Sequence, residues 1–569
     1  MRKFPRKFVL LAALLAVGLA AWVYWNRVAT SNLAIYAPAD CLLYFEVDDL
    51  PALLGGIDET QAWQALSGPL GAKTLRTNRW AVRLARWLGI GSTDVVILSR
   101  AQAALVFTGT QTSTSDSTLT VRPLGALVIE THSLTRRIQS VMETHVEQFA
   151  RGVYRKPQLI RKQIDGVDLN EWLDNESTHQ IVTAFIGSIV IVGNDEATVM
   201  NCIRASRGNE ATLASVKEFV EARRLPTAAN RMLFSFASKA GLNSLLQAYL
   251  IAKSGSTADD LTASGFLARI LGNLIDGLAC QSSFVEGTVE DRCFLKLSDG
   301  VSEKLSSSLV AQERVKLDDL PFVPADAHSV SIYHFHDVEG FWRGFNDLVA
   351  SKADVVEAVA AHALLQSILK PYGISDAGAF VHAIGTHVQT IRLDEKSPTV
   401  LITEALDRQS LRKIVDERLG TKPVTEQVGD FDVLISSTDN WSASFADNHL
   451  LVGPADAVRR CLQARRESRS ITSVEAFRHA QQLIDVSLPL ATVTFTNDQD
   501  GAISFVELFS ETDRPTFSSN ASRIDERRKA IPYTVNVSLM KNNGFEWTQR
   551  SPFGVAGVIF AGINPQRFW

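Results

Sequence analysis

The sequence has 569 residues, more than one ordinary domain usually contains. Apolar residues make up 46% of it and charged residues 21%, proportions typical of a globular protein with sizeable cores. The formal net charge is −5 at pH 7, so the chain lacks the basic excess needed to neutralise a phosphate backbone. Nucleic acid is therefore excluded as an expected partner.

A basic N-terminus and an apolar run predict a membrane anchor. Four basic residues lie within residues 1–7, and an uncharged run at 8–25 is long enough for a short transmembrane helix. The basic segment should stay cytoplasmic, so the rest of the chain should be exported. A cleaved signal peptide is the alternative, but its small-x-small site at 18–20 would lie inside the apolar run. We therefore expect a signal-anchor in the inner (cytoplasmic) membrane, with the lipid bilayer as a partner and the bulk of the chain periplasmic or extracellular.

The predicted elements mix strands and helices. In chain order they are a strand at 42–47, helices at 61–66 and 75–88, strands at 103–107 and 124–129, a helix at 133–149, three short strands within 159–192, a helix capped by Asp195, a strand at 232–236 and a hairpin turning at Glu286-Gly287. Antiparallel groups of strands with helices between them predict the α+β class with mixed, mainly antiparallel sheets. The segment 108–120 is rich in serine and threonine and predicts a mobile loop, and the polar segment 511–529 predicts disorder.

The sequence contains an internal repeat. Pro38-Ala39-Asp40 recurs as Pro324-Ala325-Asp326, and each copy opens an extended apolar stretch. Further along, IVIVGNDEA at 189–197 is matched by HLLVGPADA at 449–457, and a helical pattern follows each run. Because several matches occur in the same order, they indicate a duplicated unit.

The repeat and the anchor together predict the domain organisation. A cytoplasmic segment at 1–7 and the transmembrane anchor at 8–25 come first. Two tandem similar modules follow at 32–303 and 322–569, joined by a linker at 304–321. The two modules should pack as two similar lobes.

The cysteines suggest one disulfide. Cys280 and Cys293 are placed symmetrically about Glu286-Gly287. If these two residues form a hairpin turn, the cysteines face each other as a non-hydrogen-bonded pair, whose Cα atoms lie about 4.5 Å apart and within disulfide range. Two independent free thiols in a sheet are the alternative. Cys202 and Cys461 occupy equivalent places in the two modules, on apolar-patterned helices where cysteine serves as a small buried hydrophobe.

Histidines in the second module are the candidate metal ligands. His334 and His336 alternate along a predicted strand, so both rings should point to one face and form half of a metal site. His328 or Asp337 would be a further ligand. No third ligand has a recognisable spacing, and ordinary packed or solvated histidines are the alternative. The sequence therefore implies no cofactor.

A basic helix in the first module is a candidate membrane-surface element. Four arginines share one stripe of the predicted helix at 75–88: Arg76, Arg79, Arg83 and Arg86. Trp80 and Trp87 lie on the adjacent stripe, and such a helix can rest on anionic lipid headgroups. The alternative packs both tryptophans on the core and leaves the arginines in solvent.

Several of these features together resemble a known kind of protein. They are the basic N-terminus with its single span, the opening Pro38-Ala39-Asp40-x-x-x-Tyr44, the run LPALL at 50–54 and the motif SPFG at 551–554. The chain resembles, over nearly its whole length, a bacterial family of single-span membrane-anchored exported proteins of unknown function. The second module departs from the pattern, with GFW at 340–342 where PAL would stand. The resemblance implies no activity and no catalytic residue.

The functional expectation is a non-catalytic binding or structural module of the cell envelope, with an envelope protein or ligand as partner. No G-x-S-x-G, H-E-x-x-H or P-loop motif occurs, and Ser367-Ile368-Leu369-Lys370 matches S-x-x-K without its S-D-N and K-T-G companions. One alternative is an envelope hydrolase or metal-dependent enzyme that uses the histidine-rich second module. Another is an assembly factor that acts at the membrane surface through the arginine stripe.

Overall fold

The structure is a computed structural model that describes residues 30–72, 101–115, 118–132, 135–154, 157–174, 179–224, 231–253, 272–309, 317, 320–351, 369–420, 422–485, 490–507, 517–541 and 543–557. The predicted anchor at 8–25 and the predicted helix at 75–88 lie outside these ranges. Among the described residues, no helix is both long enough and apolar enough to cross a membrane.

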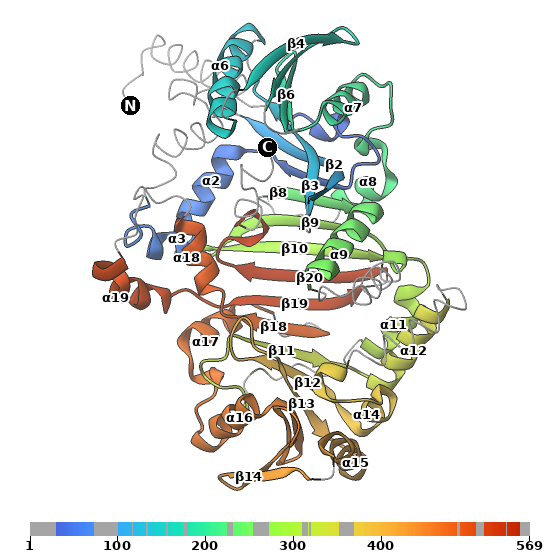
Figure 1. Cartoon of the computed structure of the whole chain (residues 1–569), viewed down its shortest axis with the longest axis vertical. Coiled ribbons are helices and arrows are strands. Elements are labelled where there is room, and N and C mark those ends of the chain that lie inside the picture. Colours follow the sequence, from blue (N-terminus) through green and yellow to red (C-terminus); the bar gives the residue numbers. More distant parts are fainter. Residues whose placement is uncertain are drawn as a thin grey trace, which may run out of the picture.

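The described strands form one sheet of 20 strands (Figure 1). Those before residue 300 are β1 (Leu43–Val47), β2 (Gln102–Ser115), β3 (Thr118–Glu130), β4 (Gln158–Ile164), β5 (Val167–Leu173), β6 (Gln180–Ile186), β7 (Ile189–Gly193), β8 (Arg231–Ser238), β9 (Ile275–Val285) and β10 (Thr288–Leu297). Those after it are β11 (Ser329–His334), β12 (Ile384–Arg392), β13 (Val400–Ala405), β14 (Val424–Val428), β15 (Phe431–Ile435), β16 (Trp441–Ala446), β17 (His449–Pro454), β18 (Thr492–Thr496), β19 (Thr534–Lys541) and β20 (Gly544–Ser551).

Every pairing in this sheet is antiparallel. The spatial order is β4-β5-β6-β7-β3-β2-β1-β8-β9-β10-β20-β19-β18-β11-β12-β13-β17-β16-β15-β14. The predicted α+β class with antiparallel pairing is therefore confirmed. The strands before residue 300 form one half of the sheet and those after it form the other. The two halves meet at the β10–β20 pairing, which runs from Val289 opposite Ser551 to Lys296 opposite Gly544. We call this pairing the seam; it makes the sheet continuous, where the sequence predicted two packed lobes.

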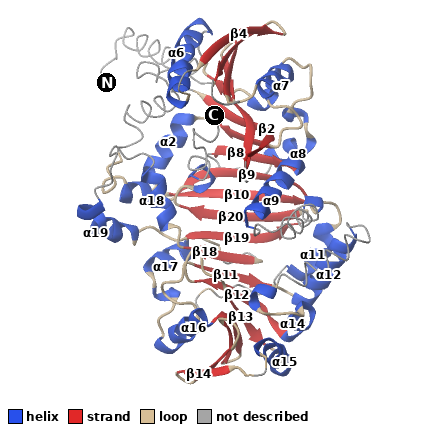
Figure 2. Cartoon of the chain, viewed as in Figure 1, coloured by secondary structure: helices blue, strands red, loops and turns tan. Residues whose placement is uncertain are grey.

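Helices connect the strands and cover both faces of the sheet (Figure 2). The α-helices are α2 (Leu50–Glu59), α3 (Gln61–Leu66), α6 (Thr135–Val153), α7 (Glu196–Ser206), α8 (Lys217–Arg223), α9 (Lys239–Lys253), α11 (Val301–Leu309), α12 (Val338–Ser351), α14 (Ala377–Ala383), α15 (Arg408–Leu419), α16 (Ala455–Glu467), α17 (Glu475–Gln482), α18 (Gln499–Glu507) and α19 (Phe517–Arg528). Short 3₁₀ helices are η1 (Leu33–Tyr36), η2 (Leu213–Ser215), η3 (Lys370–Tyr372) and η4 (Ile471–Ser473).

Alternating residues of single strands supply the two layers of core. In β13, Val400 and Ile402 pack into a cluster with α16 and α17, whereas Leu401 packs into a different cluster with α14 and α15. In β3, Val128 and Ile129 divide in the same way between the cluster under α7 and the cluster under α6. This is the two-residue period of a sheet that is buried on both faces.

Local chemistry sets several element boundaries as the sequence predicts. The Asp195 carboxylate accepts a hydrogen bond of 2.8 Å from the Thr198 amide and so caps α7. Glu286 and Gly287 both have positive φ, 53° and 76°, which gives the two-residue turn that suits the right-handed twist of a hairpin. The predicted helix at 61–66 is α3.

Other boundaries differ from the prediction. The predicted loop at 108–120 is wrong for its described part, because β2 continues to Ser115 and β3 begins at Thr118; β-branched threonines favour the extended conformation. The segment 159–192 holds parts of four strands, not three. Residues 517–528 form α19 instead of being disordered. The first part of the predicted linker at 304–321 belongs to α11, whose Leu305 and Leu309 are buried.

Candidate functional site

A pocket of about 370 Å³ lies between α6 and the β4–β5 hairpin near one end of the sheet (Figure 1). Nine residues line it: Gln139, Ser140, Glu143, Thr144, Glu147, Leu159, Arg161, Asn170 and Trp172. Its volume lies within the range usual for small-molecule sites.

One side of the pocket is a polar stripe of α6. Gln139, Glu143 and Glu147 follow each other at intervals of four residues, which places them on one face of the helix. Val146 and Ala150 follow Glu143 and Glu147 by three residues each, so they form the adjacent stripe on the same side of the helix, and they are buried against the sheet. The helix therefore docks through its apolar stripe and presents its polar stripe along the rim of the contact.

The other side of the pocket is made by two cross-strand pairs. Arg161 of β4 is directly opposite Asn170 of β5, and Leu159 is directly opposite Trp172. Residues opposite each other in an antiparallel pair share a face of the sheet, so all four side chains point toward α6. Asn170 and Trp172 are 8% and 6% exposed, and they form the buried floor.

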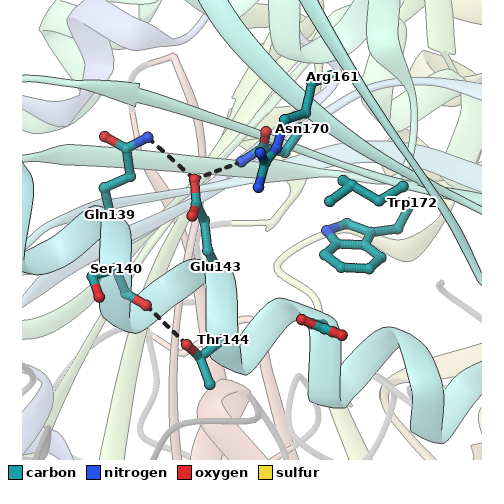
Figure 3. A pocket seen from close by; sticks show the side chains of 9 residues that line it. Gln139, Ser140, Glu143, Thr144, Arg161, Asn170 and Trp172 are labelled. Atoms are coloured by element: carbon teal, nitrogen blue, oxygen red, sulfur yellow. Dashed lines mark hydrogen bonds between the residues drawn. The ribbon is translucent and has the colours of Figure 1, made fainter.

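Glu143 is held in position by two amides. Its Oε1 accepts hydrogen bonds of 3.2 Å from Gln139 Nε2 and of 3.2 Å from Asn170 Nδ2 (Figure 3). No described residue hydrogen-bonds to its other oxygen. The carboxylate is thus oriented by neutral donors and keeps its negative charge for another partner.

Arg161 and its neighbour Lys162 have opposite surroundings. Lys162 points to the other face of the hairpin, where its Nζ lies 2.5 Å from a Glu171 oxygen and 2.7 Å from a Glu196 oxygen. These hydrogen bonds raise the pKa of Lys162. Arg161 forms no ion pair with any described carboxylate, although it lines the same pocket as Glu143. The pocket therefore contains positive and negative groups that do not neutralise each other.

The predicted histidine pair is not brought together. β11 ends at His334, which is 4% exposed, and His336 follows in an exposed bend where its amide donates to the Ser308 carbonyl at 2.9 Å. The prediction that both rings share one face of a strand is therefore wrong. The physical reason is that the chain leaves the sheet here, because the Asp337 carboxylate accepts from the Gly340 amide at 2.8 Å in the first turn of α12.

His334 instead has a partner that the sequence analysis missed. It lies directly opposite His387 of β12, and their rings stack with centroids 4.5 Å apart. His387 Nδ1 lies 3.8 Å from a Glu404 oxygen on β13. Among the described residues, no group of three or more histidine, cysteine, aspartate or glutamate side chains is placed to hold a metal ion.

The cysteines follow the sequence expectations in position. Cys280 and Cys293 are directly opposite in β9 and β10, their Cα atoms are 4.0 Å apart, and their sulfurs form a disulfide. The other three cysteines, Cys41, Cys202 and Cys461, are buried and free. Burial raises the pKa of Cys202 and Cys461 to about 12, so neither is a nucleophile at neutral pH.

Removing the disulfide is expected to lower the free energy of unfolding by about 3 kcal/mol. The bond closes a short loop and so reduces the conformational entropy of the unfolded chain, and this restriction is lost without it. The measurement is urea unfolding of the wild type and of Cys280→Ala/Cys293→Ala, each with and without reductant. Reductant should destabilise the wild type and leave the variant unchanged. Equal midpoints for fully reduced and oxidised wild type would contradict the expectation.

The arginine stripe of Arg76, Arg79, Arg83 and Arg86 lies outside the described residues. The pocket, by contrast, is described and was not predicted. Its only sequence signal is the polar stripe of the predicted helix at 133–149; the hairpin register that brings Arg161 and Trp172 to the same face gives no local signal.

Comparison of the chain with protein-family models, with curated proteins and with solved structures finds no match. The candidate site therefore rests on its own geometry.

Proposed function

We propose that this chain is a single-span, extracytoplasmic binding protein of the cell envelope, and that it binds a small polar ligand in the pocket between α6 and the β4–β5 hairpin without catalysing a reaction. The observation that carries the proposal is the oriented Glu143 carboxylate in a pocket that also exposes Arg161. Oriented charges that have no partner of their own are the features by which a protein fixes a polar ligand.

The proposed location rests on two features. The basic segment and apolar run at 1–25 have the pattern of a signal-anchor, which would leave the sheet outside the cytoplasm. The disulfide between Cys280 and Cys293 supports an exported location, because such bonds persist in oxidising compartments and are rare in the cytosol. The resemblance to a bacterial family of anchored exported proteins agrees with both, and membership remains part of this proposal.

We further propose that the halves are two copies of one module. The strand pairings support this: β1 lies between β2 and β8, and β11 lies between β12 and β18. Isolated bridges join Pro38 to Thr212 and Pro324 to Ser470, each just before a 3₁₀ helix. The first residue of each Pro-Ala-Asp motif thus makes a similar bridge in its own half, which supports the proposed duplication.

The pocket between α6 and the β4–β5 hairpin lies in the first module. Ser133-Leu134 matches Ser410-Leu411, so the position equivalent to Glu143 is Gly420. Gly420 is the C-terminal cap of α15, which has 12 residues, whereas α6 has 19. The second module therefore lacks the part of the helix that bears the polar stripe. We infer that the first module binds the ligand and that the second module has a structural role.

Neither alternative function gains a specific observation. The metal-dependent enzyme required His334 and His336 to point into one site, and His336 is instead exposed beyond the end of β11. The membrane-surface role depends on residues 76–86, which lie outside the described ranges.

The test is a ligand-observed NMR screen of the full chain, purified in detergent, against a mixture of free amino acids, sugars, nucleotides and small carboxylates. We expect at least one class to bind the wild type and to lose binding in Glu143→Ala. The matched control is Asp416→Ala, which removes an exposed carboxylate paired with Arg412 on α15, at the other end of the sheet from this pocket (Figure 1). Absence of binding by every class, or equal loss in the control, would overturn the proposed function.

A further inference from the structure

The charges in the pocket between α6 and the β4–β5 hairpin indicate which ligand it takes. Glu143 and Glu147 face it from the helix, and Arg161 faces it from the sheet. No described ion pair joins Arg161 to either carboxylate. Arg161 is exposed and Glu143 is half-buried, so both charges are hydrated when no ligand is bound, and both are available to a charged ligand that lies between them.

The two carboxylates are not equivalent. Glu147 already accepts hydrogen bonds from Arg151, at 3.0 Å from Nε and 2.6 Å from a terminal nitrogen. Glu143 accepts only from the uncharged amides of Gln139 and Asn170. Glu143 is therefore the principal negative charge available to a ligand.

The positive side has a second donor. Figure 3 shows the indole nitrogen of Trp172 turned toward the side of the pocket where Glu143 and Asn170 lie, and no described residue accepts a hydrogen bond from it. Trp172 Nε1 and the Arg161 guanidinium are both donors without acceptor capacity. Together they suit a ligand group that only accepts, such as a carboxylate.

We propose that the pocket binds an α-amino acid group, with the ligand ammonium at Glu143 and the ligand carboxylate at Arg161 and Trp172. This inference rests on the proposed function and names its ligand class. A sugar would leave both protein charges without an ionic partner. A ligand with a single charge would leave one of the two protein charges without an ionic partner. A zwitterion satisfies both at once.

The same group occurs on a free amino acid or at the end of a larger molecule that carries an amino acid through its side chain. Both sources present an ammonium and a carboxylate on one carbon, so the shared chemistry is the recognised feature. Leu159 and the face of the Trp172 ring supply the apolar surface beside it.

The experiment measures affinity by isothermal titration of the full chain with four probes: alanine, N-acetylalanine, alanine amide and glucose. Alanine should bind, and removal of either charge should weaken binding by roughly 10- to 100-fold, the range expected for a lost charge-assisted hydrogen bond. A fifth probe, lysine acetylated only on its side-chain amine, keeps its α-ammonium and α-carboxylate and tests the tethered source; an affinity equal to that of alanine assigns recognition to the group alone.

Two variants give a crossed pattern that a merely structural role would not produce. Arg161→Ala should weaken the binding of alanine but leave the affinity for alanine amide unchanged, because that probe has no carboxylate. Glu143→Gln keeps an oxygen that can accept the hydrogen bonds from Gln139 and Asn170. It should weaken the binding of alanine but not that of N-acetylalanine, which has no ammonium group. Uniform weakening of all probes would overturn the assignment of the two charges.

The failures of the two proposals are distinguishable. If glucose binds and alanine does not, and Glu143→Gln abolishes glucose binding, the pocket is a ligand site of another class and only this inference fails. If none of the probes binds and the wider NMR screen is also negative, the proposed function fails with it.

Discussion

Replacing Arg223 with alanine is expected to lower the free energy of unfolding by about 3–5 kcal/mol, because it leaves a buried carboxylate without its partner. Arg223, at the end of α8, forms an ion pair with Glu46 of β1, whose side chain is 1% exposed. The guanidinium also lies over the rings of Phe219 and Phe234, at 5.1 and 5.6 Å from their centroids. Its loss therefore removes both a charge and packing.

The second half of the chain supplies the matched control. In the proposed duplication, Glu46 corresponds to Ile332, since β1 begins at Leu43 and β11 at Ser329. Arg223 corresponds to Gln481 when α8 and α17 are aligned at their N-caps, Val216 and Val474. The double variant Glu46→Ile/Arg223→Gln removes both charges and should stay within about 1 kcal/mol of the wild type. Urea unfolding measures all three proteins. If the double variant is as unstable as Arg223→Ala, the isolated buried charge is not the cause.

The second large effect concerns the pH dependence of stability and a buried carboxyl in the seam, that of Asp291. Asp291 of β10 is 1% exposed, and burial raises its pKa from 3.8 to about 6. Its oxygens accept hydrogen bonds of 2.5 Å from Ser282 and 2.9 Å from the Val555 amide. The folded state thus binds the Asp291 proton more tightly than the unfolded state does. The contribution of Asp291 to stability is therefore greatest below pH 3.8 and is lost as the pH rises through about 6.

A shift of this size corresponds to roughly 3 kcal/mol. Asp291→Asn removes the titration, and the asparagine can still accept from Val555. We therefore expect the stability of the wild type relative to this variant to fall by roughly 2–3 kcal/mol between pH 4.5 and pH 7.5. Chemical unfolding of both proteins at both pH values measures it, and other titrating groups cancel in the difference. A constant difference across this range would show that Asp291 does not titrate there.

Features that depend on neighbouring residues could be predicted from the sequence. The Asp195 cap and the turn at Glu286-Gly287 depend on residues within one turn of each other. The juxtaposition of Cys280 with Cys293 follows from that turn by counting outward along two strands. In each case the geometry is fixed before distant parts of the chain matter.

Features that depend on distant contacts could not be predicted. The pocket requires α6 to dock against the correct face of the β4–β5 hairpin, and a register slip of one residue would turn Arg161 and Trp172 away from it. The stacking of His334 on His387 joins two strands that are about 50 residues apart in the sequence, β11 (Ser329–His334) and β12 (Ile384–Arg392). His334 and His336 were predicted to share a face because the strand was expected to reach His336. The local signal that it ends earlier is Asp337, whose carboxylate accepts from the Gly340 amide in the first turn of α12.

The seam has a consequence for the order of folding. Strands β1 to β9 pair only with strands of the first half, so these pairings can form as soon as Leu297 has been synthesised. The core cluster around Trp63 is completed later, by Phe505 and Phe553 of the second half, and until then the outer edge of β10 is also left unpaired. That edge then waits for β20, and at about 5–20 residues per second the wait lasts tens of seconds. An unpaired edge is a template for another strand. Two chains that meet in this interval can each pair β10 with the β20 of the other, which gives a dimer with exchanged halves.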